Sequence, residues 1–369
     1  MKVLILANAE SIHTKKWVVS LSEKGIDIVL FSLHAFNTSS YSDLHNFSYY
    51  NLEYNNSLNK QEAKFKKIYY LKAVSKIKNI ISIEKPDILH AHYASSYGLL
   101  GALCKFHPYI ISVWGSDIYE FPRSSIIAKT LVKYSLSKAD LVLSTSNVMA
   151  KETRKYCKKQ IEVTPFGIDL SVFYNHPHQN LFEENSIVIG TIKTLEKIYG
   201  LEYLIDAFAI VAKKLPEHKT KLLIVGSGSC EIELKDRVKK WGIQDRVLFT
   251  GFIDHSLLPK YYNNIHIFVV SSLNESFGVS VLEASACEIP VIVTNTGGLP
   301  EIVENNITGL VVPVQNADEI AKAIEKLLLN EKLRVAIGKN GRKRVETFYN
   351  WVNNVLLMIQ IYNELISKK

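Results

Sequence analysis

The chain has few of the residues that mark disulfide-bonded, metal-binding or membrane-spanning proteins. Its 369 residues include four scattered cysteines, at 104, 157, 230 and 287, with no C-x-x-C pair and no zinc-ligand spacing. This scatter fits a reducing compartment, so we expect a cytoplasmic protein. The longest apolar runs, such as YGLLGALC, are far too short to cross a bilayer. The opening residues MKVLILANAE resemble a first strand more than a signal peptide.

Two ligand-binding motifs are also missing. No two aspartates stand two residues apart, so the D-x-D spacing that carries a metal–diphosphate is absent, and the histidines are poorly spaced for a metal. We therefore expect no metal and no cofactor. No G-x-G-x-x-G follows an expected strand, which argues against a dinucleotide-dependent dehydrogenase.

Acidic residues are scarce in the first half of the chain. Residues 1–178 contain 22 Lys and Arg against 14 Asp and Glu, a net charge of +8, whereas residues 179–369 contain 22 of each and are neutral. A basic half favours an acidic partner such as nucleic acid, anionic lipid or a phosphorylated acceptor.

A lysine-rich segment, residues 64–85, has the apolar spacing of a helix. Its expected inner face is Phe65, Ile68, Leu71, Val74, Ile77 and Ile81. Its lysines form either a solvated face of a packed helix or a surface that docks on an anionic membrane, where each Lys contributes about 1 kcal/mol.

Short β-branched runs alternate with helical periods along the whole chain, which predicts parallel sheets covered by helices. The expected strands of the first half are Lys2–Ala7, Ile26–Ser32, Asp87–Ala91, Tyr109–Trp114, Asp140–Ser144 and Ile161–Thr164. Those of the second half are Ser186–Ile192, Lys221–Val225, Arg246–Thr250, His266–Val270, Pro290–Thr294 and Gly309–Val312. The predicted fold class is α/β, with two Rossmann-like doubly wound domains facing a central cleft.

The length of the chain supports two domains. We expect an N-terminal domain over residues 1–178 and a C-terminal domain over 179–349, with the polar stretch 175–185 as linker. Periodicity does not show on which domain the final helix, 350–369, packs; the family resemblance given below implies that it packs back on the first domain. Ligands of such sheets bind beyond the carboxyl ends of the strands, so the active site is expected in the cleft.

The stretch NESFGVSVLE places Glu275 and Glu283 on either side of an expected helix start at Phe277. In a continuous helix their Cα atoms would be about 12 Å apart, whereas glycosidase carboxyl pairs work at about 5–9.5 Å. Gly278 and the free N–H groups of the helix start suit a phosphate between the two carboxylates. One long ligand, a diphosphate with a sugar at one end and a ribose at the other, fits best. The alternative is a capped helix with a surface glutamate.

Further candidates follow other expected strands of the second half. Lys193 and Lys197 could neutralise a diphosphate, and Gly226 and Gly228 allow close approach of backbone. The segment 294–303, TNTGGLPEIV, begins a second helix that could accept an anion. Each of these features also has an ordinary structural interpretation, as surface lysines or strand–helix turns.

The first half offers polar residues at the same strand edge. His13 lies in the first β–α turn, His90 and His92 end another expected strand, and Gly115 and Asp117 follow the next. Taken singly, each is more simply explained as structural. Their convergence on one edge favours a binding role.

The stretch NESFGVSVLEASACEIPVIVTNTGGLPEIV, 274–303, resembles the glutamate–seven–glutamate signature of the family four retaining glycosyltransferases (glycosyl transferases group 1), which have the two-Rossmann GT-B fold. Six other pieces follow the family's order over nearly the whole chain: ANAESIHTKKW, KPDILHAHYASSYGLLGAL, SVWGSD, ADLVLSTS, VTPFGIDLSVF and LEKIYGLEYLIDAF.

The resemblance implies that Glu275 contacts the sugar hydroxyls of a nucleotide-sugar donor and Glu283 the ribose hydroxyls. It implies that Lys197 and Lys193 hold the diphosphate, and that His92 and Asp117 line the sugar and acceptor side. We expect Glu275, His92 and Asp117 to act in catalysis. The expected donor-binding residues are Lys193, Lys197, Gly226, Gly228, Ser276, Phe277, Gly278, Val279 and Glu283, and those of the acceptor side are His13 and Gly115.

Three positions depart from the family pattern. Thr191 stands where an Arg is frequent, so Lys193 is expected to substitute for it. Glu288 replaces a glycine in the turn ACEIP, and His266 replaces an Asp before the strand that leads to Glu275.

The resemblance therefore implies a metal-independent retaining hexosyltransferase that uses a UDP- or GDP-sugar. We expect a glycan or lipid-phosphate-linked acceptor in bacterial surface polysaccharide biosynthesis, and no nucleic acid partner. Peripheral contact of the basic domain with the inner face of the cell membrane is a further expectation. The alternatives are a nucleotide-sugar 2-epimerase of the same fold and a non-catalytic nucleotide-sugar-binding subunit of a synthase complex.

Overall fold

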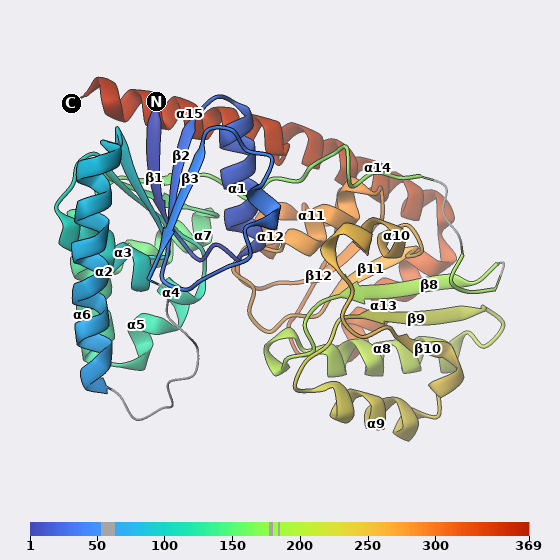
Figure 1. Cartoon of the computed structure of the whole chain (residues 1–369). Helices are drawn as coiled ribbons and strands as arrows, with labels where there is room; N and C mark the ends of the chain where they lie inside the picture. Colours follow the sequence, from blue (N-terminus) through green and yellow to red (C-terminus); the bar gives the residue numbers. More distant parts are fainter. Residues whose placement is uncertain (53–62, 177–179, 184, 369) are drawn as a thin grey trace. The chain divides into compact units, whose positions relative to one another are not determined.

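The computed structural model describes residues 1–52, 63–176, 180–183 and 185–368, and the side chains of 63–71 lie outside the description. The chain forms two compact units. The first comprises Met1–Pro165 and Asn353–Lys369, and the second comprises Phe166–Val352. Each unit is an α/β domain with its own parallel sheet (Figure 1).

The first unit is built on a seven-stranded parallel sheet in the order β3-β2-β1-β4-β5-β6-β7. Its strands are β1 (Lys2–Leu6), β2 (Asp27–Ser32), β3 (Phe47–Asn51), β4 (Ile88–His92), β5 (Tyr109–Val113), β6 (Leu141–Ser144) and β7 (Ile161–Val163). In the middle of the sheet Val3 is in register with Ile28 on one side and Ile88 on the other. The central strands are buried on both faces, as their continuous apolar runs predict.

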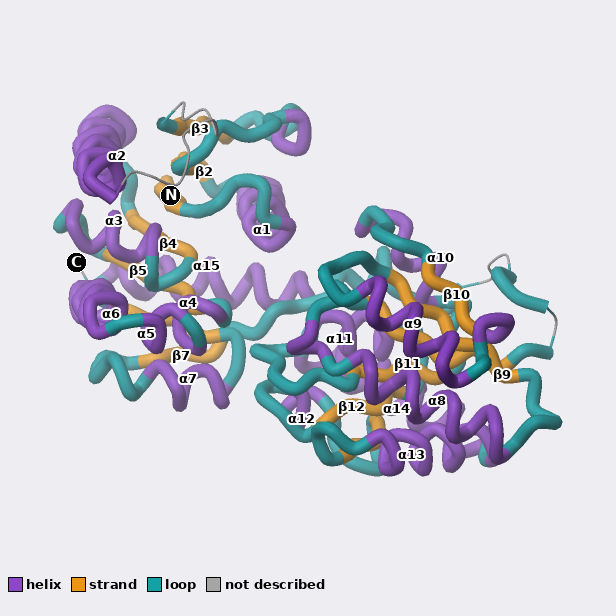
Figure 2. The backbone as a smooth tube through the Cα atoms, turned by 90° about the horizontal axis from the view of Figure 1, so that it is seen from below, coloured by secondary structure: helices purple, strands orange, loops and turns teal. Residues whose placement is uncertain are grey.

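Helices cover both faces of this sheet. They are α1 (Ile12–Glu23), α2 (Ala63–Glu84), α3 (Ser96–Cys104), α4 (Ser116–Tyr119), α5 (Phe121–Ser124), α6 (Ile126–Lys138), α7 (Asn147–Thr153) and α15 (Trp351–Ser367). Figure 2 shows α2, α3 and α6 side by side on one face, and α1 and α15 on the other. A short 3₁₀ turn, η1 (Ser39–Tyr41), precedes β3.

The second unit repeats this architecture with six parallel strands in the order β10-β9-β8-β11-β12-β13. They are β8 (Ile187–Ile192), β9 (Thr220–Val225), β10 (Val247–Phe249), β11 (Ile267–Val270), β12 (Val291–Thr294) and β13 (Gly309–Val312). Its helices are α8 (Leu201–Lys214), α9 (Glu231–Trp241), α10 (Leu258–Tyr262), α11 (Val279–Ala286), α12 (Leu299–Ile302), α13 (Ala317–Leu329) and α14 (Glu331–Phe348). Three 3₁₀ turns, η2 (Lys197–Tyr199), η3 (Gln244–Arg246) and η4 (His255–Leu257), complete it.

All twelve expected strands are present, which confirms the predicted fold class of two Rossmann-like α/β domains. The thirteenth strand, β3, was not predicted. It lies at the edge of the first sheet and none of its residues is fully buried, so it lacks the apolar run of an interior strand.

The change between units comes at Pro165 and Phe166, earlier than the predicted residue 178. The reason is that the segment after Phe166 is held by the second unit. The backbone N–H of Ile168 donates to the carbonyl of Tyr349, and the Ile168 carbonyl accepts from Trp351. The described parts of the predicted linker are attached there as well, since His176 N–H donates to Asn263 and Leu181 N–H to Asn264.

The last helix returns to the first unit, as the family resemblance implied, and a buried histidine anchors it. His90 on β4 lies 2.7 Å through Nδ1 from the hydroxyl of Tyr362 on α15, and 2.8 Å through Nε2 from the hydroxyl of Ser112 on β5. Burial lowers the pKa of His90 to about 3. The imidazole is therefore neutral at physiological pH and links the helix to the sheet.

The lysine-rich segment forms α2, and its described part packs as expected. Ile77 is buried and Val74 and Ile81 pack against the same core, while Lys72 and Lys78 are exposed. The side chains of Phe65, Ile68 and Leu71 lie outside the described residues. No helix in the described part of the chain is long and apolar enough to span a bilayer.

The unusual Glu288 occupies a left-handed position after α11, with φ of +60°. The N–H of Ile289 donates to the carbonyl of Ala284 and that of Glu288 to the carbonyl of Ser285, which is the arrangement in which glycine usually follows a helix. A side chain in this conformation costs about 1–2 kcal/mol.

We therefore expect Glu288→Gly to raise the free energy of unfolding by about 0.5–1 kcal/mol, after the greater chain entropy of glycine is subtracted. Urea denaturation measures the change. Glu288→Ala is the matched control, because it removes the carboxylate and keeps Cβ. An equal gain in both variants would attribute the effect to charge and contradict the backbone explanation.

Candidate functional site

The predicted donor residues lie in loops at the carboxyl edge of the second sheet and in α11, which follows one of these loops, and hydrogen bonds join the loops. The N–H of Lys193 donates to Val225 at the end of β9, and that of Leu195 donates to Ser227. The N–H of Leu273 donates to Ile198. Loops after β8, β9 and β11 therefore form one connected surface at the edge where ligands of such sheets bind.

The structure brings Lys193 and Glu275 into direct contact. Lys193 Nζ donates to Glu275 Oε2 at 2.5 Å, and the two side chains are only 16% and 12% exposed. Lys193 Nζ also lies 4.4 Å from the centre of the Tyr199 ring. An ion pair this shielded from water is held more firmly than a surface pair. Both residues were predicted as site residues from the sequence, and the structure shows that they form an ion pair.

Glu283 is buried in the second turn of α11 and both of its oxygens have partners. The hydroxyl of Tyr262 donates to Oε2 at 2.6 Å, and His255 Nε2 lies 3.0 Å from Oε1. Burial, and then the charge of Glu283, raise the pKa of Tyr262, so its hydroxyl stays protonated as a donor. A carboxylate offers about four acceptor positions, so Glu283 retains capacity for ligand hydroxyls.

The helix start between the two glutamates lies two residues later than predicted. Gly278 has φ of +113° and precedes α11, which begins at Val279. The ring of Phe277 is buried and packs 5.8 Å from Phe166 and 6.0 Å from Tyr349, so only its backbone can face a ligand. The first N–H groups of α11 have no partner within the helix and suit an anion. The predicted continuous helix from Phe277 is therefore wrong, whereas Ser276 and Gly278 stay next to a helix start.

Gly226 and Gly228 pack against the loop that carries Lys193. A Cβ on Gly226, whose φ is +135°, would lie 2.0 Å from the carbonyl oxygen of Lys193. One on Gly228 would lie 2.5 Å from that of Leu195. These glycines allow the loops to meet. Lys197 is exposed on η2 in the same loop.

Several residues of this site carried no signal in the sequence. Tyr262 and His255 are 21 and 28 positions from Glu283, so only the fold brings them to it. Tyr199, whose ring Lys193 Nζ approaches, was not singled out either. Ser280, in the first turn of α11, has a buried hydroxyl with no hydrogen-bond partner among the described residues. A ligand oxygen could supply that partner.

Two departures from the family pattern have a structural explanation. Thr191 is buried in β8, and the nearby cation is Lys193. His266 accepts a hydrogen bond through Nδ1 from the N–H of Val188, at 3.1 Å. A carboxylate could accept the same bond, so His266 can replace an aspartate here.

The first unit gathers its candidates at the carboxyl ends of β1, β4 and β5. The His92 ring lies 4.3 Å from that of Trp114, and the His13 ring lies 5.7 Å from Trp114. Thr14 Oγ1 is 3.5 Å from His92 Nδ1. Burial, then His90 and His13, lower the pKa of His92, so it is a neutral imidazole at physiological pH.

Asp117 is buried and its carboxylate binds backbone. It accepts from the N–H of Ala94 at 2.8 Å, of Gly115 at 2.9 Å and of Trp114 at 3.2 Å. Burial raises its pKa despite these bonds. These contacts fix the loops after β4 and β5 and so hold Trp114 and Gly115 in place.

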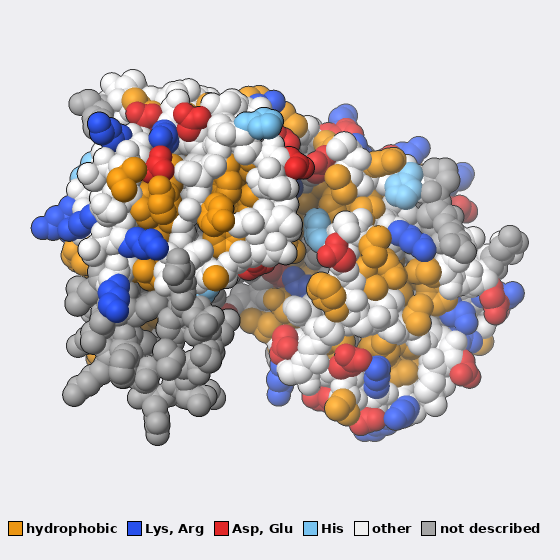
Figure 3. All heavy atoms as spheres, viewed as in Figure 1, with side chains coloured by type: hydrophobic (Ala, Val, Ile, Leu, Met, Phe, Trp, Pro, Cys, Tyr) orange, Lys and Arg blue, Asp and Glu red, His pale blue; other side chains and the backbone are white. Residues whose placement is uncertain are grey.

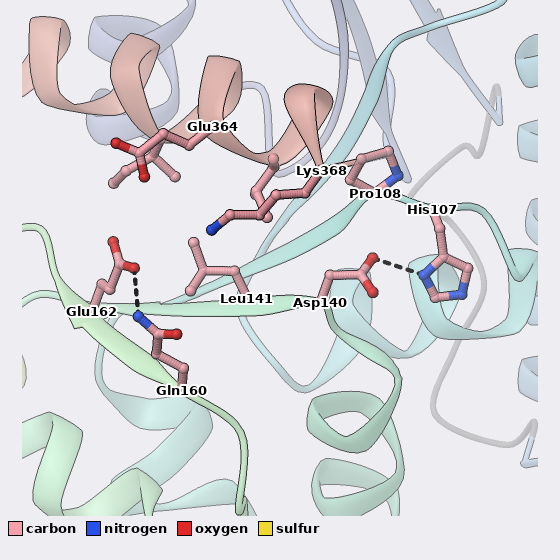
Figure 4. Close-up of a pocket in the computed structure, with 10 residues that line it drawn as sticks. His107, Pro108, Asp140, Leu141, Gln160, Glu162, Glu364 and Lys368 are labelled. Carbon is pink, nitrogen blue, oxygen red and sulfur yellow. Dashed lines mark hydrogen bonds and ion pairs between the residues drawn. The ribbon is translucent and has the colours of Figure 1, made fainter.

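A cavity of about 400 Å³ lies at the opposite edge of the first sheet. It is lined by residues before or at the starts of β5, β6 and β7 and by the end of α15. Figure 4 shows Glu364 and Lys368 above it and His107 paired with Asp140, with a separation of 2.7 Å. No predicted site residue lines this cavity.

Two family models match the chain. The model described as glycosyl transferases group 1 matches residues 173–344, and the one described as glycosyl transferase 4-like matches residues 2–146. The capsular polysaccharide biosynthesis glycosyltransferase CapM of Staphylococcus aureus is 30% identical over 76% of this chain and 77% of its own. The N-acetyl-alpha-D-glucosaminyl L-malate synthase of Bacillus anthracis is 29% identical over 75% and 74%.

Solved structures show the same fold at low sequence identity. Sucrose-phosphate synthase of Thermosynechococcus elongatus aligns with a TM-score of 0.82 at 22% identity and covers both chains completely. HepE of Anabaena, solved with UDP and glucose, aligns with a TM-score of 0.81 at 18% identity over 99% of this chain and 100% of its own. With two matching family models and a relative of 30% identity over most of both chains, the protein belongs to the glycosyl transferases group 1 family and has the GT-B fold.

Proposed function

We propose that the protein is a retaining glycosyltransferase that moves a sugar from a UDP- or GDP-linked donor to a glycan or lipid-linked acceptor. The observation that carries the proposal is the edge of the second sheet. There the Lys193–Glu275 pair lies on connected loops, next to the start of α11, and Tyr262 donates to Glu283 inside that helix. The relatives that make a capsular polysaccharide and a glucosaminyl malate, and the neighbour solved with UDP, support it.

The proposed chemistry follows from charge. Cleavage of a sugar–phosphate bond builds positive charge on the anomeric carbon and negative charge on the leaving diphosphate. Lys193, Lys197 and the first N–H groups of α11 would neutralise the diphosphate. Glu275 would bind sugar hydroxyls and Glu283 the ribose hydroxyls. The neutral His92 and the Trp114 ring would contact the sugar and acceptor, with Asp117 as a positioning residue.

Retention would follow from attack on the face that the diphosphate leaves, with the leaving phosphate taking the proton of the acceptor hydroxyl. The acceptor oxygen forms a bond to the anomeric carbon as the bond between that carbon and the phosphate oxygen breaks. The atoms balance without any further reactant.

The first test is a panel of UDP-, GDP- and ADP-sugars, with binding followed by thermal shift and turnover by release of the nucleoside diphosphate. NMR coupling constants of the product report its anomeric configuration. Turnover of the donor with no acceptor, to give an epimer, would favour the 2-epimerase instead. Binding without transfer or hydrolysis across the panel would favour the non-catalytic subunit.

We also propose that the reaction needs no metal ion, because Lys193, Lys197 and the start of α11 supply the positive charge that a metal–diphosphate site would otherwise provide. Treatment with EDTA is expected to leave kcat within about twofold of its initial value, a free-energy change below about 0.5 kcal/mol. A complete loss of turnover that manganese restores would reject the proposal. A known metal-dependent transferase in the same buffer shows that the chelator is effective.

A further inference from the structure

One segment of the first unit, residues 121–159, holds most of the net charge of the chain. It contains nine Lys and Arg against two Asp and Glu, a net formal charge of +7, compared with +8 for the whole chain. All nine side chains are exposed, and Glu152, one of the two acids, is already paired with Arg123 and Lys155. The segment includes α5, α6 and α7, and the structure describes all of it.

Two largely exposed isoleucines begin α6 within this basic segment. Ile126 is 84% exposed and Ile127 is 73% exposed. Further along the helix Val132 and Leu136 face the core, so α6 is firmly attached to the sheet. The helix start does not require the isoleucines, because the Ser125 side chain caps it by accepting from the N–H of Ala128 at 3.0 Å.

Lysines continue the exposed face that the isoleucines begin. Lys129 and Lys133 follow Ile126 by three and seven positions, so the three side chains share one side of the helix. We call Ile126, Ile127, Lys129 and Lys133 the α6 surface. An apolar end next to a basic stripe is typical of helices that lie in the interface of an anionic membrane.

We propose that the α6 surface docks on an anionic lipid bilayer, with Ile126 and Ile127 at the boundary between headgroups and acyl chains and the lysines at lipid phosphates. Charge complementarity selects this partner. In a symmetric contact between two copies of the chain, the same patch meets itself, so two strongly basic segments would repel each other. An anionic bilayer supplies both the apolar layer and the opposite charge.

The α6 surface lies at the same edge of the first sheet as the residues proposed to contact the acceptor. A helix that follows a strand in a parallel sheet begins at the carboxyl edge, and only α4 and α5 separate Trp114 from Ile126. His92, Trp114 and Asp117 lie at that same edge. Docking would hold these residues near the membrane surface, where a lipid-anchored acceptor is presented. This last point rests on the proposed function, whereas docking does not.

The test is co-sedimentation of the full chain with vesicles of phosphatidylcholine that contain about one-third phosphatidylglycerol, at low and high salt. We expect binding that weakens as salt rises, and none to phosphatidylcholine alone. Ile126→Ser with Ile127→Ser should lower the partition coefficient about tenfold or more. Lys129→Gln with Lys133→Gln should lower it about tenfold at low salt and much less at high salt.

Matched controls come from the second unit. Ile232 on α9 is 77% exposed, and Lys339 and Lys343 lie four positions apart on α14 with exposed side chains. Figure 3 shows acidic and basic side chains interspersed over the visible face of this unit. Ile232→Ser, and Lys339→Gln with Lys343→Gln, should leave vesicle binding unchanged. Equal losses in variants and controls would overturn the proposal.

Two further measurements distinguish membrane docking from a contact between two copies of the chain, and from failure of the donor proposal. Light scattering that shows a dimer in the native chain and a monomer in the isoleucine variant, without vesicle binding, would make the α6 surface a contact between copies and overturn docking. Thermal shift with UDP should be equal in all variants. If neither UDP nor GDP shifts any of them, including the native chain, the donor proposal fails while the vesicle result still decides docking.

Discussion

Glu275→Ala is expected to lower kcat about a hundredfold or more, with nucleotide affinity preserved or increased. A charged hydrogen bond contributes about 1.5–3 kcal/mol, and two such bonds to sugar hydroxyls exceed the roughly 2.7 kcal/mol of a hundredfold effect. The ion pair adds a second expectation. In the structure Lys193 donates to Glu275, so removal of Glu275 leaves that cation available to a diphosphate. Steady-state kinetics and calorimetric titration with UDP measure the two effects.

The controls distinguish this role from a general loss of structure. Glu325, which pairs with Lys214 at 2.8 Å on the surface of the same unit, is the matched carboxylate, and Glu325→Ala should leave kcat unchanged. Glu275→Gln keeps the size of the side chain and should retain part of the activity. Full activity in Glu275→Ala would reject the assignment, and so would equal losses of turnover and of UDP affinity.

Glu283→Gln is expected to raise the Kd of UDP and of the donor sugar about tenfold to a hundredfold, with little change in kcat at saturating donor. The amide loses one acceptor oxygen, and Tyr262 and His255 compete with the ribose for the one that remains. The charged hydrogen bonds that are lost contribute about 1.5–3 kcal/mol. Calorimetric titration measures the affinities.

Inorganic pyrophosphate gives the control that isolates the ribose, because it carries the diphosphate charge and lacks the sugar. Its affinity should be the same for the native chain and Glu283→Gln. Tyr262→Phe should weaken UDP binding less than Glu283→Gln does, since it removes one hydrogen bond to Glu283 and keeps the carboxylate. A loss of pyrophosphate affinity equal to the loss for UDP would show that the substitution disturbs the loop and would remove the ribose role.

The fold was predictable from the sequence because buried parallel strands have continuous apolar runs. The interior strands have such runs, whereas the short edge strands β7 and β10 have no fully buried residue and were predicted from short apolar, β-branched runs. Each of the twelve predicted strands occurs. β3 was missed because Phe47–Asn51 mixes aromatic with polar residues and has no continuous apolar run. The unit boundary was misplaced because backbone bonds such as Ile168 to Tyr349 join segments far apart in the sequence.

The residues of the candidate site that follow a strand were predictable from the sequence. The partners that reach the site from other helices and turns were not. Glu275 and Lys193 were visible as charged residues after strand ends, and Glu283 as a charged residue in the helix that follows; the structure places the first two together. The partners of Glu283 were not visible, because His255 lies in η4 and Tyr262 in α10, with no fixed spacing to α11. The helix start shifted because Gly278 adopts a left-handed conformation that periodicity does not report.

The contact between Tyr362 on α15 and His90 on β4 means that the first unit is complete only once α15 has been synthesised. During synthesis residues 353–369 leave the ribosome after residues 166–352, so the second unit has all of its described sequence before the first unit receives α15. A gene that ends at residue 165 would encode the first sheet without α15. The imidazole of His90, which is buried in the whole protein, and the apolar residues that α15 covers would then be exposed to solvent. Anyone who wishes to express the first unit separately should graft the final helix onto it through a short linker.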